Sequence, residues 1–399
     1  MPHSPDSPDS PDSIAESHVG PAGLTLGAVD VLPSGGLEER LATGASLRVK
    51  LGIDPTAPDI HLGHVVVLEK LRQFQAAGHT AVLIIGDYTA RVGDPSGRSS
   101  ERPVLSAEQI EVNARTFQEQ AFKVLDPEAT EVRFNSEWLE MPSAELFGLA
   151  RRFTVARLLE RDDFTRRMAA AEPISMLELL YPVLQGYDSV AVEADLELGG
   201  TEQKFNLLFG RDVQASFGQR PQLVMTLPIL PGTDGVRKMS KSLDNYVGVT
   251  EAPAEIFGKL MSIPDTALET YRLLLLGAEI DDGVGPLEAK RELARRICDR
   301  FAGPGAGEEA AARFDLVHRA GEIPTDIPAH ELGTADPVHL PNLLREGLGL
   351  SGSEARRLIE QGAVRLDGVA IDPDRLDVRR AELTGRVLQI GKRRFLKLT

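Results

Sequence analysis

Short apolar segments alternate with segments of helical spacing along the first part of the chain. Leu47–Leu51 and Ala81–Ile85 have the pattern of strands, and Val65–Ala77 has that of a helix, stopped by Gly78. Leu223–Leu227 is another candidate strand. This alternation favours an α/β fold with a parallel sheet and helices on both faces. In such sheets ligands bind at the carboxyl ends of the strands.

The remainder of the chain separates into a helical region and a small α/β module. Residues 252–300 have helical spacing, and residues 302–337 are rich in Gly, Pro, Ala and Glu, which indicates a linker within them. The module is predicted to contain two helices and two hairpins, namely Leu340–Leu348, Ser353–Gln361, a hairpin that turns at Asp367-Gly368 and another that turns at Gly391-Lys392.

Composition excludes several classes of protein. The chain has 399 residues, of which 42% are apolar, and this length suggests two or three domains with a substantial core. No apolar run approaches the roughly 18 residues of a membrane span. The initial Ser-Pro-Asp repeats do not resemble a secretory signal, and the single Cys298 rules out an internal disulfide and a multi-cysteine zinc site. We therefore expect a cytoplasmic protein with a disordered tail over residues 1–30.

The charge is unevenly distributed along the chain. The net charge of −16 argues against nonspecific coating of DNA. Residues 341–399 hold 12 Lys and Arg against 8 Asp and Glu, whereas the rest of the chain holds 32 against 52. A basic module on an acidic body suggests local contact with a polyanion, with chance variation in surface charge as the alternative.

The first chemical motif is Gly52-Ile-Asp-Pro-Thr56 followed by His61-Leu-Gly-His64, where a strand ends and a helix begins. Histidines three residues apart share a helix face, and the free N–H groups and dipole of a helix start favour phosphate. Gly63 lets a flat ligand approach the backbone. Two ordinary surface histidines are the alternative, and a metal site is disfavoured because the other histidines are scattered.

The second motif is Lys238-Met-Ser-Lys-Ser242, in a loop flanked by glycine. Lys238 and Lys241 are point charges that can reach a triphosphate, although a solvated basic loop is the usual interpretation of such a pair. Together and in this order, the two motifs resemble the signature of the class I aminoacyl-tRNA synthetases. The resemblance implies ATP as a substrate whose phosphates both motifs stabilise, Mg²⁺ bound through the triphosphate, and no metal site on the protein.

A third group of residues concerns the amino acid. Tyr181, Gln185 and Asp188 have i, i+4, i+7 spacing, so one helix face presents a phenol, an amide and a carboxylate, although Pro182 can kink that helix. Tyr181 and Gln185 can meet an ammonium group, and Asp188 can accept a hydrogen bond from a phenol. An amphipathic helix with its polar face outward is the alternative.

In this context the chain resembles the bacterial tyrosyl-tRNA synthetases from about Leu47 to the C-terminus, including Gly86–Gly97, Phe134–Trp138 and Gly199–Gln203. The resemblance implies a substrate-binding set of Tyr181, Gln185, Asp188, Asp94, Gln203, Asn135 and Thr89. It implies ATP or adenylate contacts from Gly52, Asp54, His61, Gly63, His64, Gly200, Glu202 and Lys241. It implies a catalytic set of Thr56, His61, His64, Lys238, Lys241, Arg98 and Arg102.

Two positions depart from that family. Many bacterial members have a second tyrosine where Lys50 stands, to share recognition of the phenol. A charged lysine cannot accept a hydrogen bond, so we expect Asp188 to carry more of this task. Many members also have Asp where Glu202 stands, and Glu202 keeps the negative charge but adds a methylene.

The terminal module resembles the RNA-binding domain first described in ribosomal protein S-four. We expect five basic residues to contact RNA phosphate and shape, namely Arg356, Arg357, Arg365, Lys392 and Arg393. A small charged domain without a ligand is the alternative. The predicted order is a tail (1–30), a Rossmann-like catalytic domain (31–250), a helical domain (251–325), a linker (326–339) and the RNA-binding domain (340–399).

The resemblance implies attachment of L-tyrosine to tRNA(Tyr) through a tyrosyl-adenylate, by a protein that is a homodimer and has no DNA or membrane partner. A tryptophanyl-tRNA synthetase, a small-molecule nucleotidyltransferase and a non-catalytic RNA-binding factor are the competing interpretations. The phenol-facing Asp188 and the RNA-binding module disfavour the first two, and the intact His61, His64, Lys238 and Lys241 disfavour the third.

Overall fold

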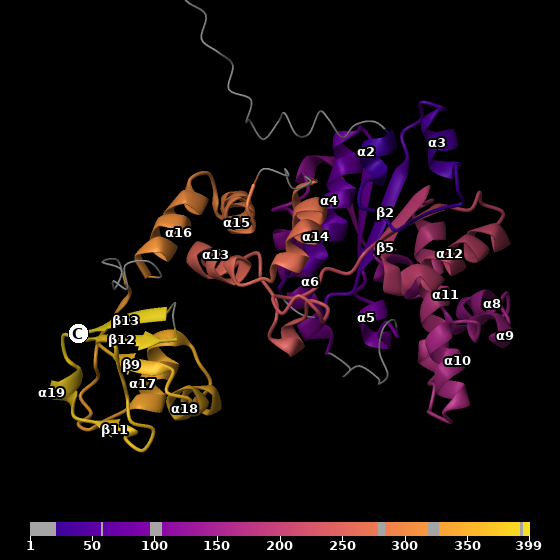
Figure 1. The fold of residues 1–399 in the computed structure, drawn as a ribbon. Coiled ribbons are helices and arrows are strands. Elements are labelled where there is room, and N and C mark those ends of the chain that lie inside the picture. The colour runs from indigo at the N-terminus through magenta and orange to yellow at the C-terminus, as the bar shows by residue number, and fades with distance from the viewer. Residues whose placement is uncertain (1–20, 57–58, 96–105, 278–283, 318–326, 392–393) are drawn as a thin grey trace, which may run out of the picture. The chain divides into compact units, whose positions relative to one another are not determined.

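The computed structural model describes residues 21–56, 59–95, 106–277, 284–317, 327–391 and 394–399, and it divides into two compact units (Figure 1). Unit 1 holds the described residues up to Thr250 together with Ile263–Ala289. Unit 2 holds Glu251–Ser262 and the described residues from Lys290 onward. Both nucleotide motifs therefore belong to unit 1, and the basic module belongs to unit 2.

The described part of unit 1 is built on a six-stranded sheet in the order β1-β6-β5-β2-β3-β4. All neighbouring strands are parallel except β1, which is antiparallel to β6. The strands are β1 (Asp30–Leu32), β2 (Arg48–Ile53), β3 (Thr80–Ile85), β4 (Thr130–Phe134), β5 (Leu196–Gly200) and β6 (Leu223–Leu227). The predicted parallel α/β sheet is confirmed, and β3 and β6 are almost entirely buried in it.

Helices cover both faces of this sheet, with α4 and α14 on one side and α11 and α12 on the other (Figure 1). The helices of unit 1 are α2 (Pro21–Thr25), α3 (Gly36–Leu41), α4 (Leu62–Ala76), α5 (Thr89–Val92), α6 (Ala107–Ala121), α7 (Ser136–Leu139), α8 (Ser143–Ala150), α9 (Val155–Leu158), α10 (Asp162–Ala169), α11 (Met176–Ala191), α12 (Lys204–Ser216) and α14 (Asp265–Leu276). Single 3-10 turns occur at Pro127–Ala129, Thr201–Gln203 and Lys241–Leu243.

Local sequence determines where α11 begins, and this helix carries Tyr181, Gln185 and Asp188. Ser175 Oγ accepts a hydrogen bond from the Glu178 N–H at 3.2 Å, and Glu178 Oε1 accepts one from the Ser175 N–H at 3.0 Å. This reciprocal cap satisfies two backbone donors that the helix leaves free. Arg167 also pairs with the Glu178 carboxylate. The helix then continues through Pro182 to Ala191, so the proline does not end it.

The first part of unit 2 is helical. It contains α13 (Pro253–Met261), most of α15 (Pro286–Ala302) and α16 (Ala306–Asp315), with α13 packed against α16. Cys298 of α15 is buried with a free thiol. The predicted helical domain is thus divided, because α14 packs on α4 within unit 1. Among the described residues, no helix has both the length and the apolarity that a membrane span requires.

The C-terminal module has its own core. Its helices are α17 (Leu340–Leu348), α18 (Gly352–Glu360) and α19 (Arg380–Leu383), and its strands are β7 (Ala329–His330), β8 (Val338–His339), β9 (Val364–Leu366), β10 (Val369–Ala370), β11 (Asp377–Val378), β12 (Val387–Ile390) and β13 (Arg394–Leu398). Five strands form a sheet in the order β10-β9-β12-β13-β7, and β11 pairs with β8. The hairpin predicted at Asp367-Gly368 is confirmed, with φ of 47° and 85° at its two turn residues.

Two stretches contain more regular structure than the sequence indicated. Residues 21–30, assigned to the tail, form α2 and begin β1, and Leu24 is buried. Residues 326–339, assigned to the linker, contain β7 and β8. β7 pairs with β13, the last strand of the chain. Strands of two or three residues have no readable periodicity, so only their tertiary partners define them.

Candidate active site

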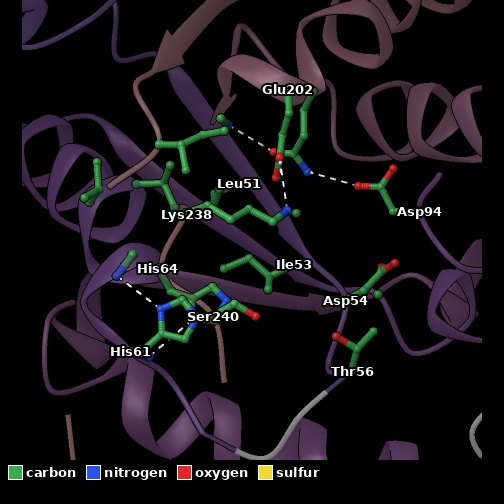
Figure 2. A pocket seen from close by; sticks show the side chains of 18 of the residues that line it. Leu51, Ile53, Asp54, Thr56, His61, His64, Asp94, Glu202, Lys238 and Ser240 are labelled. Atoms are coloured by element: carbon green, nitrogen blue, oxygen red, sulfur yellow. Dashed lines mark hydrogen bonds and ion pairs between the residues drawn. The ribbon is translucent and has the colours of Figure 1, made fainter. Parts of the chain in front are cut away.

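The carboxyl ends of β2, β3 and β5 open onto a cavity of about 490 Å³, completed by the start of α4, the buried face of α11 and the loop after β6 (Figure 2). Every predicted unit 1 residue that the structure describes lines it, namely Gly52, Asp54, Thr56, His61, Gly63, His64, Thr89, Asp94, Asn135, Tyr181, Gln185, Asp188, Gly200, Glu202, Gln203, Lys238 and Lys241. Arg98 and Arg102 lie outside the described residues.

Two stacked histidines form the start of α4 (Figure 2). His61 is the N-cap, and its Nδ1 accepts a hydrogen bond from the Gly63 N–H at 3.2 Å. His64 Nδ1 accepts one from the His61 N–H at 3.3 Å, and the ring centroids are 4.0 Å apart. A Cβ at Gly63 would lie 3.0 Å from the His61 ring, so glycine lets that ring fold over the helix start.

Both imidazoles are neutral at pH 7. Burial, followed by the charges of His64 and Lys241, lowers the pKa of His61 to about 2. Burial and Lys241 lower the pKa of His64 to about 4. A neutral ring whose Nδ1 accepts a hydrogen bond carries its proton on Nε2. The two histidines therefore offer Nε2–H groups that can donate hydrogen bonds to an anionic ligand.

Asp54 follows β2 at the rim of the cavity and is oriented by two donors. The Tyr181 hydroxyl donates to Asp54 Oδ2 at 2.9 Å, and Thr89 Oγ1 donates to Asp54 Oδ1 at 2.7 Å. A Cβ at Gly86 would lie 2.1 Å from Asp54 Oδ1 and 2.4 Å from Thr89 Oγ1, so only glycine leaves room there. Asp54 thus links the end of β2 to α11.

Asp188 is a buried carboxylate at one end of the cavity. It accepts hydrogen bonds from Trp138 Nε1 at 2.8 Å and from Asn135 Nδ2 at 3.4 Å. Burial raises its pKa to about 7, although the charge of Lys50 and these two hydrogen bonds act in the opposite direction. Asn135 also donates to Thr89 Oγ1 at 2.9 Å, so one hydrogen-bonded path connects Asp188 with Asp54.

Gln185 lies between the cavity and a buried ion pair. Its Nε2 donates to Glu197 Oε1 at 3.0 Å, and its Oε1 accepts a hydrogen bond from Asn206 Nδ2 at 3.0 Å. Lys50 Nζ is 2.9 Å from Glu197 Oε1, and neither of these side chains is among those that line the cavity. Lys50 stands where many members of the family have a tyrosine that recognises the phenol. The structure instead buries Lys50 between β2 and α11.

A glutamine and an asparagine approach Asp94 from the start of α12. Gln203 Nε2 and Asn206 Nδ2 are each 3.5 Å from the Asp94 carboxylate oxygens. Gln203 Oε1 accepts a hydrogen bond from the Gly200 N–H at 3.1 Å, which orients the amide. Because Asp94 is buried, its carboxylate favours a cationic group at this end of the cavity.

The loop after β6 carries the two lysines into the cavity. Lys238 reaches toward Glu202, with Nζ 3.3 Å from Oε2 (Figure 2), and Lys241 pairs with Asp59. Asn245 holds the loop, because its side chain accepts a hydrogen bond from the Ser240 N–H at 2.9 Å and donates one to the Lys238 carbonyl at 3.1 Å. Both ammonium groups thus lie near carboxylates that a polyanionic ligand can displace.

Comparison with known proteins decides the family. The model of "tRNA synthetases class I (W and Y)" matches residues 42–297, and that of the "S4 domain" matches residues 340–376. The tyrosine–tRNA ligase of Bordetella pertussis is 53% identical over 371 residues, which cover 90% of this chain and 89% of that protein. The ligase of Moorella thermoacetica is 50% identical over 94% of each chain. The chain belongs to the tyrosine–tRNA ligases.

Solved structures agree at the level of the fold. The C-terminally truncated mitochondrial tyrosyl-tRNA synthetase of Aspergillus nidulans has a TM-score of 0.61 at 20% identity, covering 76% of this chain and 94% of that one. The tyrosyl-tRNA synthetase of Archaeoglobus fulgidus, complexed with L-tyrosine, has a TM-score of 0.59 at 21% identity. The match covers 74% of this chain and 99% of that one. The predicted class I synthetase fold with a C-terminal S4 domain is confirmed.

Sequence reasoning missed several polar residues that contact the predicted site residues or Lys50. Trp138 contacts Asp188, and Asn206 contacts Gln185. Asp59 contacts Lys241, and Glu197 contacts Lys50. One signal was readable, because Glu197 is a charged residue between two leucines of a buried strand. A charge in such a strand requires a buried partner. Nothing local identifies that partner as Lys50.

The S4 module presents arginines on its surface. Arg356 and Arg357 of α18 and Arg365 of β9 are exposed, and contact with RNA would require that exposure. Lys392 and Arg393, also predicted, lie outside the described residues. Ala355 and Ile359 of α18 are buried in the core of the module. The arginines of α18 therefore point away from that core because of the helical period.

Proposed function

We propose that this ligase attaches L-tyrosine to tRNA(Tyr) in two steps, through a tyrosyl-adenylate. The observation that carries the proposal is a single cavity with imidazole and ammonium donors beside the start of α4 and a buried carboxylate, Asp188, on α11. A nucleotide triphosphate suits the first group of side chains, and a phenol suits the second. Membership of the tyrosine–tRNA ligases supports the same assignment.

The amino-acid end of the site recognises tyrosine through complementary polar groups. Asp188 receives the phenolic hydroxyl, and its neighbours Trp138 and Asn135 keep it oriented. Tyr181, Gln185, Asp94 and Gln203 lie near the α-ammonium group, with Thr89 and Asn135 supporting the wall between the two ends. Buried acceptors that are left unpaired by a poorer ligand supply the selectivity.

The phosphate end stabilises charge that develops during adenylation. The tyrosine carboxylate oxygen attacks the α-phosphorus of ATP, the bond from that phosphorus to the bridging oxygen breaks, and pyrophosphate leaves with the electron pair. The Nε2–H groups of His61 and His64 and the ammonium groups of Lys238 and Lys241 meet this charge. Thr56, Arg98 and Arg102 complete the phosphate contacts. The attacking carboxylate is already ionised at pH 7, so no general base is required.

The remaining residues border the nucleotide. Gly52, Gly63 and Gly200 allow the adenylate to approach the backbone, and Asp54 and Glu202 lie beside it. ATP enters as its Mg²⁺ complex, with the metal bound through the triphosphate, since Mg²⁺ is commonly held by substrate phosphates. In the second step the 3′-terminal ribose hydroxyl of the tRNA attacks the adenylate carbonyl and AMP leaves. The S4 module holds the tRNA, and the reaction takes place in the cytoplasm.

The active form is a homodimer. Large apolar side chains on neighbouring helices of unit 1 are exposed, namely Phe147 of α8, Val155 of α9, Met168 of α10, and Met176 and Leu177 of α11. Figure 1 shows these helices together at one end of the unit. An apolar patch of this kind is typical of a contact between protein chains. Sedimentation of the wild-type chain and of a Phe147→Asp variant measures the association.

ATP–pyrophosphate exchange with each amino acid in turn tests the proposed activity. We expect exchange with L-tyrosine and at least about tenfold less with phenylalanine. Exchange that depends on tryptophan would support the tryptophanyl alternative. Exchange with no amino acid would contradict the proposal, and a non-catalytic RNA-binding role would then be favoured.

A further inference from the structure

We propose that the buried Lys50–Glu197 ion pair is a positioning device that fixes the orientation of the Gln185 amide for the α-ammonium group of the substrate. The inference rests on the proposed function, because it takes tyrosine as the ligand. Lys50 and Glu197 are opposite each other on the adjacent parallel strands β2 and β5, and their side chains are 0% and 1% exposed. They lie at the centre of the sheet, directly behind the helix that lines the cavity.

The lysine is fully satisfied by this arrangement. Its ammonium group has three N–H donors. Nζ lies 2.8 Å from Ser189 Oγ, 3.0 Å from the carbonyl oxygen of Gln185 and 2.9 Å from Glu197 Oε1. Two of these partners belong to α11, one turn apart. Lys50 therefore ties the turn of α11 that carries Gln185 to β2.

The glutamate is satisfied equally well. Oε1 is 2.9 Å from Lys50 Nζ and accepts a hydrogen bond from Gln185 Nε2 at 3.0 Å. Oε2 accepts from Ser189 Oγ at 3.2 Å and from Gln222 Nε2. A carboxylate buried this deeply is costly without a compensating charge, which Lys50 supplies. The pair thus keeps an acceptor, and only an acceptor, beside the Gln185 side chain.

An ionised carboxylate cannot donate a hydrogen bond, so Gln185 must turn its NH₂ group toward Glu197. Its carbonyl oxygen then faces the other way, where Asn206 Nδ2 donates to it at 3.0 Å. That oxygen has a second lone pair, and Gln185 lines the cavity. A flipped amide would present NH₂ to the substrate instead and repel an ammonium group. The charge on Glu197 therefore decides which end of the amide the substrate meets.

The decisive variant is the double substitution Lys50→Met with Glu197→Gln. Either substitution alone leaves a buried charge without its partner and lowers the melting temperature, whereas the double variant removes both charges at similar volume. A glutamine at position 197 can donate or accept, so it no longer dictates the orientation of Gln185. The matched control is Arg40→Met with Asp195→Asn, which removes another ion pair of unit 1 whose residues do not line the cavity.

Two tyrosine analogues test the contact between Gln185 and the ammonium group of the ligand. Both are used as competitive inhibitors of tyrosine-dependent exchange, and their inhibition constants are measured. Tyramine keeps the phenol and the ammonium group, and 3-(4-hydroxyphenyl)propionate keeps the phenol and lacks the ammonium group. In the double variant we expect the inhibition constant of tyramine to rise at least about tenfold. That of the propionate should stay within about twofold, and the control variant should change neither.

Coupling to Gln185 provides a second test. In a Gln185→Ala background the same double substitution has no amide to orient, so tyramine inhibition should weaken by less than about twofold further. Unchanged tyramine inhibition in the double variant, or an equal loss for both analogues, would overturn the inference. Tyrosine-dependent exchange by the wild-type chain would still stand in either case. Its absence from the wild-type chain would instead refute the proposed function.

Discussion

Single side chains of this site act through protonation states that their surroundings impose. His61 and His64 are partly buried and lie next to each other and near Lys241, so both stay neutral and donate from Nε2. Asp188 shows the opposite effect, because burial raises its pKa to about 7. In each case desolvation favours the neutral form of the group. The site therefore places neutral donors at its phosphate end and a weakly acidic carboxyl at its phenol end.

The raised pKa of Asp188 predicts a pH-dependent stability. The folded protein binds this proton more tightly than the unfolded chain, whose carboxyl has a pKa near 3.8. The stabilising contribution is complete below about pH 4 and is lost as the pH rises toward 7. Urea unfolding between pH 4.5 and 8.5 should show the wild type losing free energy of unfolding relative to Asp188→Asn as the pH increases. A pH-independent difference between the two proteins would contradict the assignment.

Asp188 also carries the predicted discrimination against phenylalanine. Phenylalanine lacks the hydroxyl, so it leaves this buried acceptor without its ligand partner, at a cost of about 1–3 kcal/mol or more for a charged group. We expect Asp188→Ala to reduce the tyrosine-over-phenylalanine ratio of kcat/KM at least tenfold in the exchange assay. Tyr187→Phe is a suitable control, because Tyr187 belongs to the same helix and packs against a different cluster. An unchanged ratio with lower rates for both substrates would assign Asp188 a structural role.

At the scale of elements, the C-terminal module has a hydrophobic core of its own. The described residues of this core lie between Leu332 and Leu398, and they include Leu344 of α17, Ile359 of α18 and Leu388 of β12. Its sheet is completed by β7, which lies outside the region matched by the S4 model. The module therefore begins before β7, and a cut between β7 and α17 would leave an edge of its sheet unpaired.

Truncation after Leu316 is expected to separate the two activities. It removes the whole module with β7 and leaves the cavity intact, because every residue that lines the cavity belongs to unit 1. Tyrosine-dependent pyrophosphate exchange should stay within about twofold of the wild type, while tRNA charging should fall by about tenfold or more as phosphate contacts are lost. The matched comparison is truncation after His339, which removes α17 and all later elements but retains β7. Equal damage to exchange and charging would show that the module supports the fold of the catalytic unit.

At the scale of the molecule, charge distribution governs the encounter with tRNA. The chain carries a net charge of −16, yet residues 341–399 carry more basic than acidic side chains. The acidic remainder disfavours indiscriminate binding of nucleic acid, and the basic module attracts it locally. Affinity for tRNA should therefore depend steeply on salt and reside mainly in the exposed arginines.

The double substitution Arg356→Ala with Arg357→Ala tests this view. Each lost phosphate contact should lower the slope of log affinity against log salt concentration by about one. We expect weaker tRNA binding, a reduced slope and unchanged pyrophosphate exchange, measured by filter binding over a salt series. Arg375→Ala is the control, because Arg375 already pairs with Glu382 at 2.6 Å in the same module. An unchanged slope would place the RNA contacts elsewhere.

The sequence determined much of the site because its signals are local. The run Leu223–Leu227 is a strand with those bounds, Leu340–Leu348 is a helix with those bounds, and His61 lies at a helix start as predicted. The spacing of Tyr181, Gln185 and Asp188 placed them on one buried face of α11. These features follow from periodicity, capping and turn chemistry, which act over a few residues.

Only the tertiary structure decided which distant groups meet. Lys50 and Glu197 pair because β2 and β5 are neighbours in the sheet, and strand order is a property of the whole fold. Trp138 reaches Asp188 from another helix, and β7 exists because β13 lies beside it. The low pKa values of the two histidines likewise arise from burial by segments far away in the chain. Burial and strand neighbours are sums over long-range contacts, so the local pattern does not contain them.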